Sequence, residues 1–318
     1  MLDVRRLRLL RELALHGTIR ATAEALSFTP SAVSQQLAVL EREAGIALLE
    51  RRGRSVSLTP AGNALVERTE SILAQLAEAE AEAKAIAGAA VPSVLVASFP
   101  SAAATIVAEA ASAADGLAMT ILEADPRVGL ARLRAGEVDV AIVWEYDFVP
   151  IPAPGAVELV PLLDDPVHVV LPRGHPAASH GTVDLAQLAD EPWINSTALS
   201  SCRPFLSRAL NAAGVEPRVT AETNDHRALH RLVASGVGLA LVPVLSQLDL
   251  PSTLVARPIW PGPPKRRIYA AARRARRPEQ VGRALELLTS AAADWAERVV
   301  ELDAAARREG LAVASAGG

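Results

Sequence analysis

The sequence has 318 residues, and half of them are apolar, so the chain is long enough for two or three compact domains with packed cores. No apolar run approaches the roughly 20 residues of a membrane-spanning helix, and the charged start of the chain lacks a signal-peptide core, so we expect a cytoplasmic protein. The net charge of −4 excludes a uniformly basic chain, but residues 1–58 hold nine Arg against six acidic residues, a mildly basic head before an acidic body.

The first residues predict two short helices. Leu7, Leu10 and Leu13 recur at helical spacing, and Gly17 provides a C-terminal stop. Thr18 is a favoured N-cap residue, so a second helix starts there.

A third helix is predicted to begin at Thr29 and Pro30, because Thr is a favoured N-cap residue and proline is favoured at the first helical position. Val33, Leu37 and Leu40 share one face and are expected in the core. The opposite face carries small or polar residues, namely Ser31, Ser34, Gln35 and Ala38. Two short helices joined by a tight turn, the second with small polar groups outward, describe a helix-turn-helix whose Gln35 is the best candidate to read base edges.

Residues 48–58 predict a wing, in which two short strands meet at Arg52-Gly53-Arg54 and present a cationic tip to phosphates or the minor groove. The alternative is a three-helix packing domain with an exposed charged hairpin. The residues that we expect to contact double-stranded DNA are Thr18, Arg20, Thr29, Pro30, Ser31, Ser34, Gln35, Arg51, Arg52 and Arg54.

Residues 59–90 predict one long helix, with Thr59 as its N-cap and Pro60 at the first helical position. About 29 residues form a rod of roughly 40 Å, too long for one small domain to cover. From Ile72 onward, apolar and small residues are spaced alternately by four and three, as in a coiled coil. We therefore expect a dimerisation helix, and the alternative is a solvated linker. The expected dimer contacts are Leu65, Ile72, Leu76 and Ile86.

Strand-like and helical segments alternate over the remainder of the chain, which predicts parallel βαβ units in an α/β fold. The pattern restarts near residues 161–166, so we expect two lobes with a cleft between them. The expected boundaries are residues 1–58 for the head, 59–90 for the linker helix, 91–163 with 266–300 for lobe I, 164–265 for lobe II, and 301–318 for a frayed C-terminal tail.

Ligands of such folds bind at the carboxyl ends of strands, and this rule selects several loops. Two serine-rich helix starts, near Ser101 and Ser201, offer N–H groups and hydroxyls to an anion, and Arg203 adds positive charge. We therefore predict a carboxylate-bearing metabolite, with Glu123, Asp125 and Glu145 suited to an amino group on the same ligand. The alternatives are a different ligand class, ordinary serine N-caps and solvated acids. The expected effector contacts are Ser98, Pro100, Ser101, Glu123, Asp125, Trp144, Ser196, Thr197, Ser201, Arg203 and Asn224.

The sequence contains no P-loop, GxSxG, HExxH or dinucleotide-binding glycine pattern, so we expect neither an enzyme nor a cofactor. His226 and His230 are four residues apart on one helix face, but without a third ligand at set spacing a packing role is favoured over a metal. Cys202 is the only cysteine, and we favour a bystander thiol over an oxidation sensor. A solute-binding protein without its signal peptide and an enzyme with a fused helical head are less favoured alternatives.

The head resembles the LysR-type transcriptional regulators over about 60 residues. The matching residues are Gly17-Thr18, Ala23-Glu24-Ala25-Leu26, Thr29-Pro30-Ser31-Ala32-Val33-Ser34, Leu40-Glu41, Gly45, Leu48, Arg51, Arg54 and Leu58-Thr59-Pro60-Ala61-Gly62. The resemblance implies a winged helix-turn-helix, a linker helix and a two-lobed effector domain similar to periplasmic binding proteins. It also implies a homodimer, pairing further into a tetramer, that places two recognition helices in successive major grooves. The family often has Gln where this chain has Pro30, so base contact is expected to shift toward Ser34 and Gln35.

Overall fold

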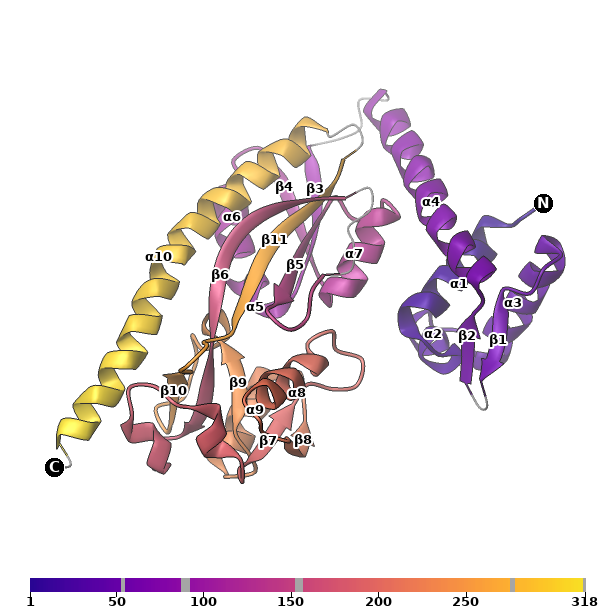
Figure 1. Cartoon of the computed structure of the whole chain (residues 1–318). Helices are drawn as coiled ribbons and strands as arrows, with labels where there is room; N and C mark the ends of the chain where they lie inside the picture. Colours follow the sequence, from indigo (N-terminus) through magenta and orange to yellow (C-terminus); the bar gives the residue numbers. More distant parts are fainter. Residues whose placement is uncertain (53–54, 87–91, 152–156, 275–277, 317–318) are drawn as a thin grey trace. The chain divides into compact units, whose positions relative to one another are not determined.

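The computed structural model describes residues 1–52, 55–86, 92–151, 157–274 and 278–316 (Figure 1). The chain divides into two compact units, the first made of Met1–Val91 with Arg127–Asp139 and the second of Pro92–Pro126 with Val140–Gly318. No helix among the described residues is both long and apolar enough to cross a membrane.

The first unit begins with three helices and a two-stranded antiparallel hairpin, namely α1 (Val4–His16), α2 (Ile19–Ala25), α3 (Pro30–Ala44), β1 (Leu49–Arg52) and β2 (Ser55–Leu58). Gly17 ends α1 with a φ of 73°, a left-handed conformation that glycine adopts without strain. Thr18 and Thr29 cap α2 and α3 with their hydroxyl oxygens, as their positions predict. The predicted winged helix-turn-helix is therefore confirmed.

The core of this first unit includes the apolar positions that helical spacing predicts. Leu10, Val33 and Leu40 are fully buried, and Leu37 is 1% exposed. Burying a leucine of this kind contributes about 1.5–3 kcal/mol relative to leaving it in water. The same packing turns the opposite face of α3 toward solvent.

α4 (Pro60–Ile86) leaves the hairpin through a tight corner at Thr59 and Gly62. The hydroxyl of Thr59 accepts a hydrogen bond from the Gly62 N–H at 3.0 Å and donates to the Ala47 carbonyl at 2.9 Å. A Cβ on Gly62 would lie 2.3 Å from the Leu48 carbonyl oxygen, so the backbones approach too closely for any other residue. This close approach gives a physical reason for glycine at this position.

All of α7 (Pro126–Arg134) except its first residue, and the residues after it as far as Asp139, also belong to the first unit. An Arg11 guanidinium nitrogen lies 2.8 Å from a Glu137 carboxylate oxygen, and Arg11 is nearly buried. The backbone of Gly136 packs against Ala74, where an added Cβ would come within 3.0 Å. The helix α4 is thus covered along part of its length within this unit.

The second unit is built on a seven-stranded sheet in the order β10-β6-β11-β5-β3-β4, with β9 also paired to β6. The strands are β3 (Ser93–Ser98), β4 (Ala118–Glu123), β5 (Val140–Tyr146), β6 (Val157–Pro172), β9 (Ala240–Pro243), β10 (Leu254–Pro258) and β11 (Lys265–Arg273). β3 is parallel to β4 and β5, as the alternation of strands and helices predicts. β11 instead runs antiparallel between β5 and β6, because the chain returns from the second lobe to close the sheet.

The other elements of the second unit are short helices and strands around this sheet, together with one long C-terminal helix. They are α5 (Pro100–Ala102), η1 (Ala103–Val107), α6 (Ala108–Ser112), η2 (Pro176–Ser179), η3 (Leu185–Leu188), β7 (Pro192–Asn195), α8 (Arg203–Ala212), β8 (Arg218–Glu222), α9 (His226–Ala234), η4 (Val244–Ser246) and α10 (Glu279–Ala316). β7 and β8 form a separate parallel pair.

β6 joins two lobes within the second unit. Its first part pairs with β11, and from Val167 onward it pairs with β9 and β10. One core lies around the first part and includes Val140 and Ile268. A second core lies around the other part and includes Leu171 and Trp193. The expectation of a two-lobed α/β fold is therefore confirmed.

The C-terminal residues that we expected to be a frayed tail form the end of α10, which is helical to Ala316. Asp303 contacts the buried His168 at 2.8 Å, and Glu309 contacts the buried Arg257 at 3.1 Å. A buried guanidinium needs a nearby negative charge, and these contacts hold the helix against the second lobe. The expectation of a frayed tail was wrong because it rested on the small residues at the end of the sequence. The sequence does not show that Asp303 and Glu309 have buried partners in the second lobe. Figure 1 shows α10 passing along β6, which it contacts.

Candidate functional site

The exposed face of α3 carries small and polar side chains. Ser31, Ser34 and Gln35 are all exposed, while Val33 and Leu37 on the other face are buried. Thr29 caps the helix by accepting a hydrogen bond from the Ala32 N–H at 3.2 Å, and its hydroxyl lies 3.1 Å from that of Ser31. The backbone at this end of the helix is therefore fixed, and its outer side offers hydroxyl and amide groups without bulk.

The two consecutive glutamines of α3 have different surroundings. The Gln36 side-chain oxygen accepts a hydrogen bond from Arg6 at 3.0 Å, and Arg6 also pairs with Glu43. Gln35 forms no side-chain hydrogen bond with any residue that the structure describes. Because its amide is unused within the chain, Gln35 has both a donor and an acceptor to offer an external partner.

The cationic residues expected at the DNA are only partly described. The Arg20 side chain is 85% exposed and donates to Glu24 at 2.9 Å. The backbones of Arg51 and Arg52 lie in β1, but their side chains lie outside what the structure describes, as does all of Arg54. Thr18 is the N-cap residue of α2, and Pro30 is the first residue of α3. The contact of the wing tip with phosphates stays a prediction.

An apolar stripe on α4 has no covering among the described residues. Ile72 is 39% exposed and Leu76 is 43% exposed, which is high for large apolar side chains. Ala79 and Ala83 continue the stripe at spacings of three and four and are also exposed. Leu65 packs instead against the core of the first unit, so it does not belong to this stripe. The side chain of Ile86 lies outside the described residues.

A cavity of about 330 Å³ lies within the second unit, and it has an aromatic wall formed by Phe99, Trp144 and Tyr146. It gathers loops from the carboxyl ends of β3, β4 and β5 and from the starts of α8 and α9. Of the effector contacts that the sequence predicts, those that line the cavity are Pro100, Ser101, Glu123, Asp125, Trp144, Ser196 and Asn224. The rule that ligands bind at the carboxyl ends of strands, called the strand-end rule below, therefore predicts seven of the residues that line one cavity.

Four other predicted contacts do not line this cavity. Ser98 is fully buried and donates to the Phe99 carbonyl at 3.2 Å. Ser201 donates to Asp125 from its N–H at 2.9 Å and its hydroxyl at 2.8 Å. Thr197 accepts a hydrogen bond from the side-chain amide of Asn224 at 2.7 Å, so it supports a residue that does line the cavity.

Arg203 does not supply the positive charge of the cavity. Its guanidinium pairs with Glu222 at 2.7 Å, and both side chains are more than a third exposed. The hydrogen bond from Arg203 lowers the pKa of Glu222, and the pair neutralises itself at the surface. The expectation failed because the ion pair joins α8 to β8, two elements whose partner residues the sequence does not reveal.

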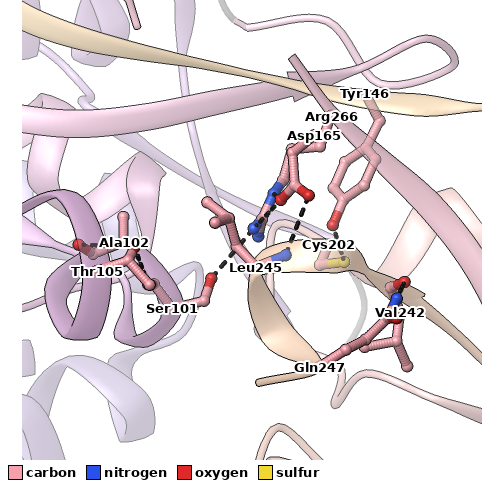
Figure 2. Close-up of polar contacts among 10 residues, drawn as sticks. All are labelled: Ser101, Ala102, Thr105, Tyr146, Asp165, Cys202, Val242, Leu245, Gln247 and Arg266. Atoms are coloured by element: carbon pink, nitrogen blue, oxygen red, sulfur yellow. Dashed lines mark hydrogen bonds and ion pairs between the residues drawn. The ribbon is translucent and has the colours of Figure 1, made fainter. Parts of the chain in front are cut away.

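Arg266 supplies a cation that our sequence reading did not single out. It lies on β11, is 4% exposed, and lines the cavity with its guanidinium 4.9 Å from the centre of the Phe99 ring. Its terminal nitrogen Nη2 donates to Asp165 at 2.6 Å and to the Ser101 hydroxyl at 3.1 Å (Figure 2). The run Lys265-Arg266-Arg267 could have indicated this inward-facing cation. Alternate residues of a strand face opposite sides, so the middle residue of the run can point inward.

The Arg266–Asp165 pair keeps the Arg266 guanidinium charged inside the protein. Burial alone would lower the pKa of Arg266, but the Asp165 carboxylate offsets this and the pKa is raised above its ordinary value. Asp165 is itself fully buried and also accepts a hydrogen bond from the Leu245 N–H at 3.1 Å. Buried charges persist in proteins when they are paired and hydrogen-bonded in this way.

Cys202 lies in the cavity wall at the start of α8. Its sulfur is 3.5 Å from the Tyr146 hydroxyl, and Figure 2 shows the two side chains pointing toward each other. Burial raises the pKa of the Cys202 thiol, although the hydrogen bond with Tyr146 opposes that effect. The thiol form is therefore favoured, and it is less reactive than a thiolate.

His226 and Ser246 line the same cavity, and their buried polar atoms have no hydrogen-bond partner among the described residues. The His226 and His230 rings are 6.3 Å apart between centroids. No group of three or more His, Cys, Asp or Glu side chains among the described residues has the arrangement of a metal site.

Comparison with known proteins matches two parts of the chain to family models. Residues 4–63 match the model described as "Bacterial regulatory helix-turn-helix protein, lysR family", and residues 92–293 match "LysR substrate binding domain". The small neutral protease regulatory protein of Streptomyces coelicolor is 30% identical over 274 residues, which are 86% of this chain and 82% of that protein.

Two further similarities cover most of the chain. The RuBisCO operon transcriptional regulator of Allochromatium vinosum is 27% identical over 282 residues, which are 86% of this chain and 91% of that protein. The solved structure of a cysteine mutant of Corynebacterium glutamicum OxyR, bound to H2O2, is 25% identical with a TM-score of 0.56, over 95% of this chain and 97% of that one.

Proposed function

Because the chain belongs to the LysR family of bacterial transcriptional regulators, we propose that it binds operator DNA through α3 and the wing and responds to a carboxylate-bearing metabolite in the cavity of its second unit. Members of this family are DNA-binding regulators with an effector-binding domain, and they are not enzymes. The observation that carries the metabolite proposal is the buried cation Arg266 beside an aromatic wall.

The polar face of α3 supports direct reading of a major groove. Small residues such as Ser31 and Ser34 let the helix backbone approach the bases closely. Gln35 is exposed, and a Gln amide can bond the two groove-edge atoms of an adenine at once. We expect Arg51 and Arg52, whose backbones lie in β1, to contact the neighbouring DNA backbone, where phosphate contacts fix position rather than sequence.

The exposed stripe at Ile72 and Leu76 supports a homodimer formed through α4. Apolar residues spaced by four and three are covered when a second helix packs against them. A symmetric dimer would carry two copies of α3 to the two halves of an imperfect palindrome, about one helical turn or a multiple of it apart. From membership of the family, we also expect that dimers pair into tetramers and that the protein resides in the cytoplasm with the DNA.

The cavity favours an anion of modest size. Nε and Nη2 of Arg266 already donate to Asp165 and Ser101, so within the described part of the chain Nη1 is the guanidinium nitrogen left for a ligand carboxylate, and the Asp165 pair holds the guanidinium fixed before a ligand arrives. Ser101 already accepts one donor from Arg266 and brings a hydroxyl to the same place. Phe99 and Trp144 offer apolar area to the rest of the ligand.

The position of Cys202 in the cavity wall favours a second candidate, regulation by oxidation of this thiol. The raised pKa of Cys202 disfavours the reactive thiolate, and the sequence has no second cysteine for an internal disulfide. Peroxide treatment of the wild type and of a Cys202→Ser variant separates the two candidates. We expect DNA binding to be the same in both proteins, and a loss confined to the wild type would favour oxidation sensing.

Thermal unfolding of the full chain with matched ligands tests the metabolite proposal. Carboxylic acids and their primary amides should differ, with melting temperature rising only for acids because the amide lacks the charge that Arg266 binds. Arg266→Lys keeps a cation but loses the guanidinium nitrogen Nη1 that is left for the ligand, and should weaken binding by about tenfold or more. Arg203→Ala, which removes a surface cation outside the cavity, is the matched control and should bind as the wild type does. Equal stabilisation by acids and amides would contradict the proposal.

A further inference from the structure

Two residues that line the cavity each carry a buried polar atom with no hydrogen-bond partner among the described residues. The His226 ring nitrogen Nδ1 and the Ser246 hydroxyl oxygen are both shielded from solvent, and neither has a hydrogen-bond partner among the described residues. They come from different elements, α9 and η4, yet both line the cavity that Arg266 lines. Leaving a buried polar atom unpaired is costly, so an occupant that bonds both atoms is favoured over one that does not.

The charge around these two groups restricts what that occupant can be. Burial and the nearby positive charge of Arg266 lower the pKa of His226 to about 4, so its imidazole is neutral near pH 7. A neutral imidazole does not compensate the charge of a second ligand carboxylate, and Glu123 at the cavity wall repels one. An amino group could pair with Glu123, but the Arg266 guanidinium in the same cavity repels a second cation, and Asp125 already accepts two hydrogen bonds from Ser201.

We infer that the effector is a monoanionic hydroxy or oxo acid whose carboxylate binds Arg266 and whose hydroxyl or carbonyl oxygen is held by His226 and Ser246. This inference rests on the proposed regulator function and names the ligand class of the same cavity. A hydroxyl group can donate and accept, and a carbonyl oxygen can accept two hydrogen bonds. Either one satisfies both buried groups without bringing in a second charge.

Two sets of acids that differ in one substituent provide the probes. The aromatic set is benzoate, 3-hydroxybenzoate, isophthalate and 3-(aminomethyl)benzoate, and the aliphatic set is pentanoate, 4-oxopentanoate, glutarate and 5-aminopentanoate. Affinity is measured by calorimetry on the full chain at about pH 7.5, where His226 is neutral.

The variants are His226→Leu and Ser246→Ala, which remove the polar atoms, and His226→Asn, which keeps a polar atom near the position of Nδ1. The matched control is His230→Leu, since His230 lies one turn later on α9 and does not line the cavity.

In at least one set, we expect the hydroxy or oxo acid to bind about tenfold more tightly than the other three members. His226→Leu and Ser246→Ala should remove that advantage while leaving the unsubstituted acid unchanged, and His226→Asn should restore part of it. The inference is overturned if the dicarboxylate or the amino acid binds most tightly, if the advantage survives both substitutions, or if no acid of either set binds. Footprinting of the same proteins on DNA reports the regulator function separately, so protected DNA with a failed ligand test overturns the ligand class alone.

Discussion

Arg266 and Asp165 form a buried ion pair that connects the two lobes of the second unit. Nε and Nη2 of Arg266 donate to one Asp165 oxygen at 3.1 and 2.6 Å, and the other Asp165 oxygen accepts from the Leu245 N–H. The same Arg266 reaches Ser101 at the start of α5, so β11, β6, η4 and α5 meet at one pair of charges. A ligand that binds this arginine therefore contacts a junction shared by both lobes.

Breaking this pair should destabilise the protein strongly. Asp165→Asn removes the negative charge and leaves the Arg266 guanidinium buried without its partner, at a cost of about 3–5 kcal/mol. The measurement is the free energy of unfolding in urea. Asp164→Asn is the matched control, because Asp164 is 55% exposed and pairs with the surface residue Lys265, so a change of at most about 1 kcal/mol is expected. Equal effects at the two positions would contradict the assignment of a buried pair.

Gly62 should not tolerate any side chain. An alanine Cβ at this position would meet the Leu48 carbonyl oxygen at 2.3 Å, and the corner between β2 and α4 would have to move, at a cost of about 1–3 kcal/mol or more. Gly282→Ala is the contrasting control, since an added Cβ has no neighbour within 4 Å inside α10. That change should stabilise the helix by about 0.5–1 kcal/mol. Thermal unfolding of both variants checks the opposite signs.

Acid should destabilise the protein partly through His226. The pKa of His226 is lowered from 6.5 to about 4, first by burial and then by Arg266, so the unfolded chain takes up a proton in this interval before the folded chain does. The stability that the neutral imidazole contributes is complete above pH 6.5 and is lost as the pH falls toward 4, with a total of about 3 kcal/mol at most.

The pH dependence of urea unfolding separates His226 from other titrating groups. His226→Asn removes this proton uptake, so the variant should lose less stability than the wild type between pH 6.5 and pH 4. His180→Asn, at an exposed histidine, should follow the wild-type curve. Parallel curves for wild type and His226→Asn would show that His226 is not held neutral.

Gln35→Ala should reduce sequence discrimination more than general DNA affinity. A bidentate contact to a base contributes about 1–3 kcal/mol of discrimination, whereas phosphate contacts act on all sequences alike. The ratio of operator to nonspecific affinity, measured by mobility shift at one salt concentration, should therefore fall by about tenfold or more. A uniform loss on both DNAs would mean that Gln35 contacts the backbone.

Sequence reasoning worked best where structure is decided locally. The three helices of the head follow from caps at Thr18 and Thr29 and from apolar spacing, which act over a few residues. The strand-end rule likewise brought Ser101 and Asn224 to the cavity, because it depends only on strand direction.

Contacts between distant segments were the part that sequence reasoning missed. Arg266 and Asp165 are separated by 101 residues and meet only because β11 inserts beside β6. The helical end of α10 depends in the same way on Glu309 reaching Arg257. Charge, spacing and composition do not show which distant residue will be the partner, so these features required the folded chain.

Footprinting of the purified full chain on the DNA upstream of its own gene and of the divergent neighbour tests the central claim most directly. We expect protection of two half-sites separated by about 10–10.5 base pairs or a multiple of that spacing, at moderate salt. The protection should weaken for Gln35→Ala and for Arg54→Ala, the two expected contacts from α3 and the wing. No protection at moderate salt, with the two variants behaving like the wild type, would contradict the account of this chain as an operator-binding regulator.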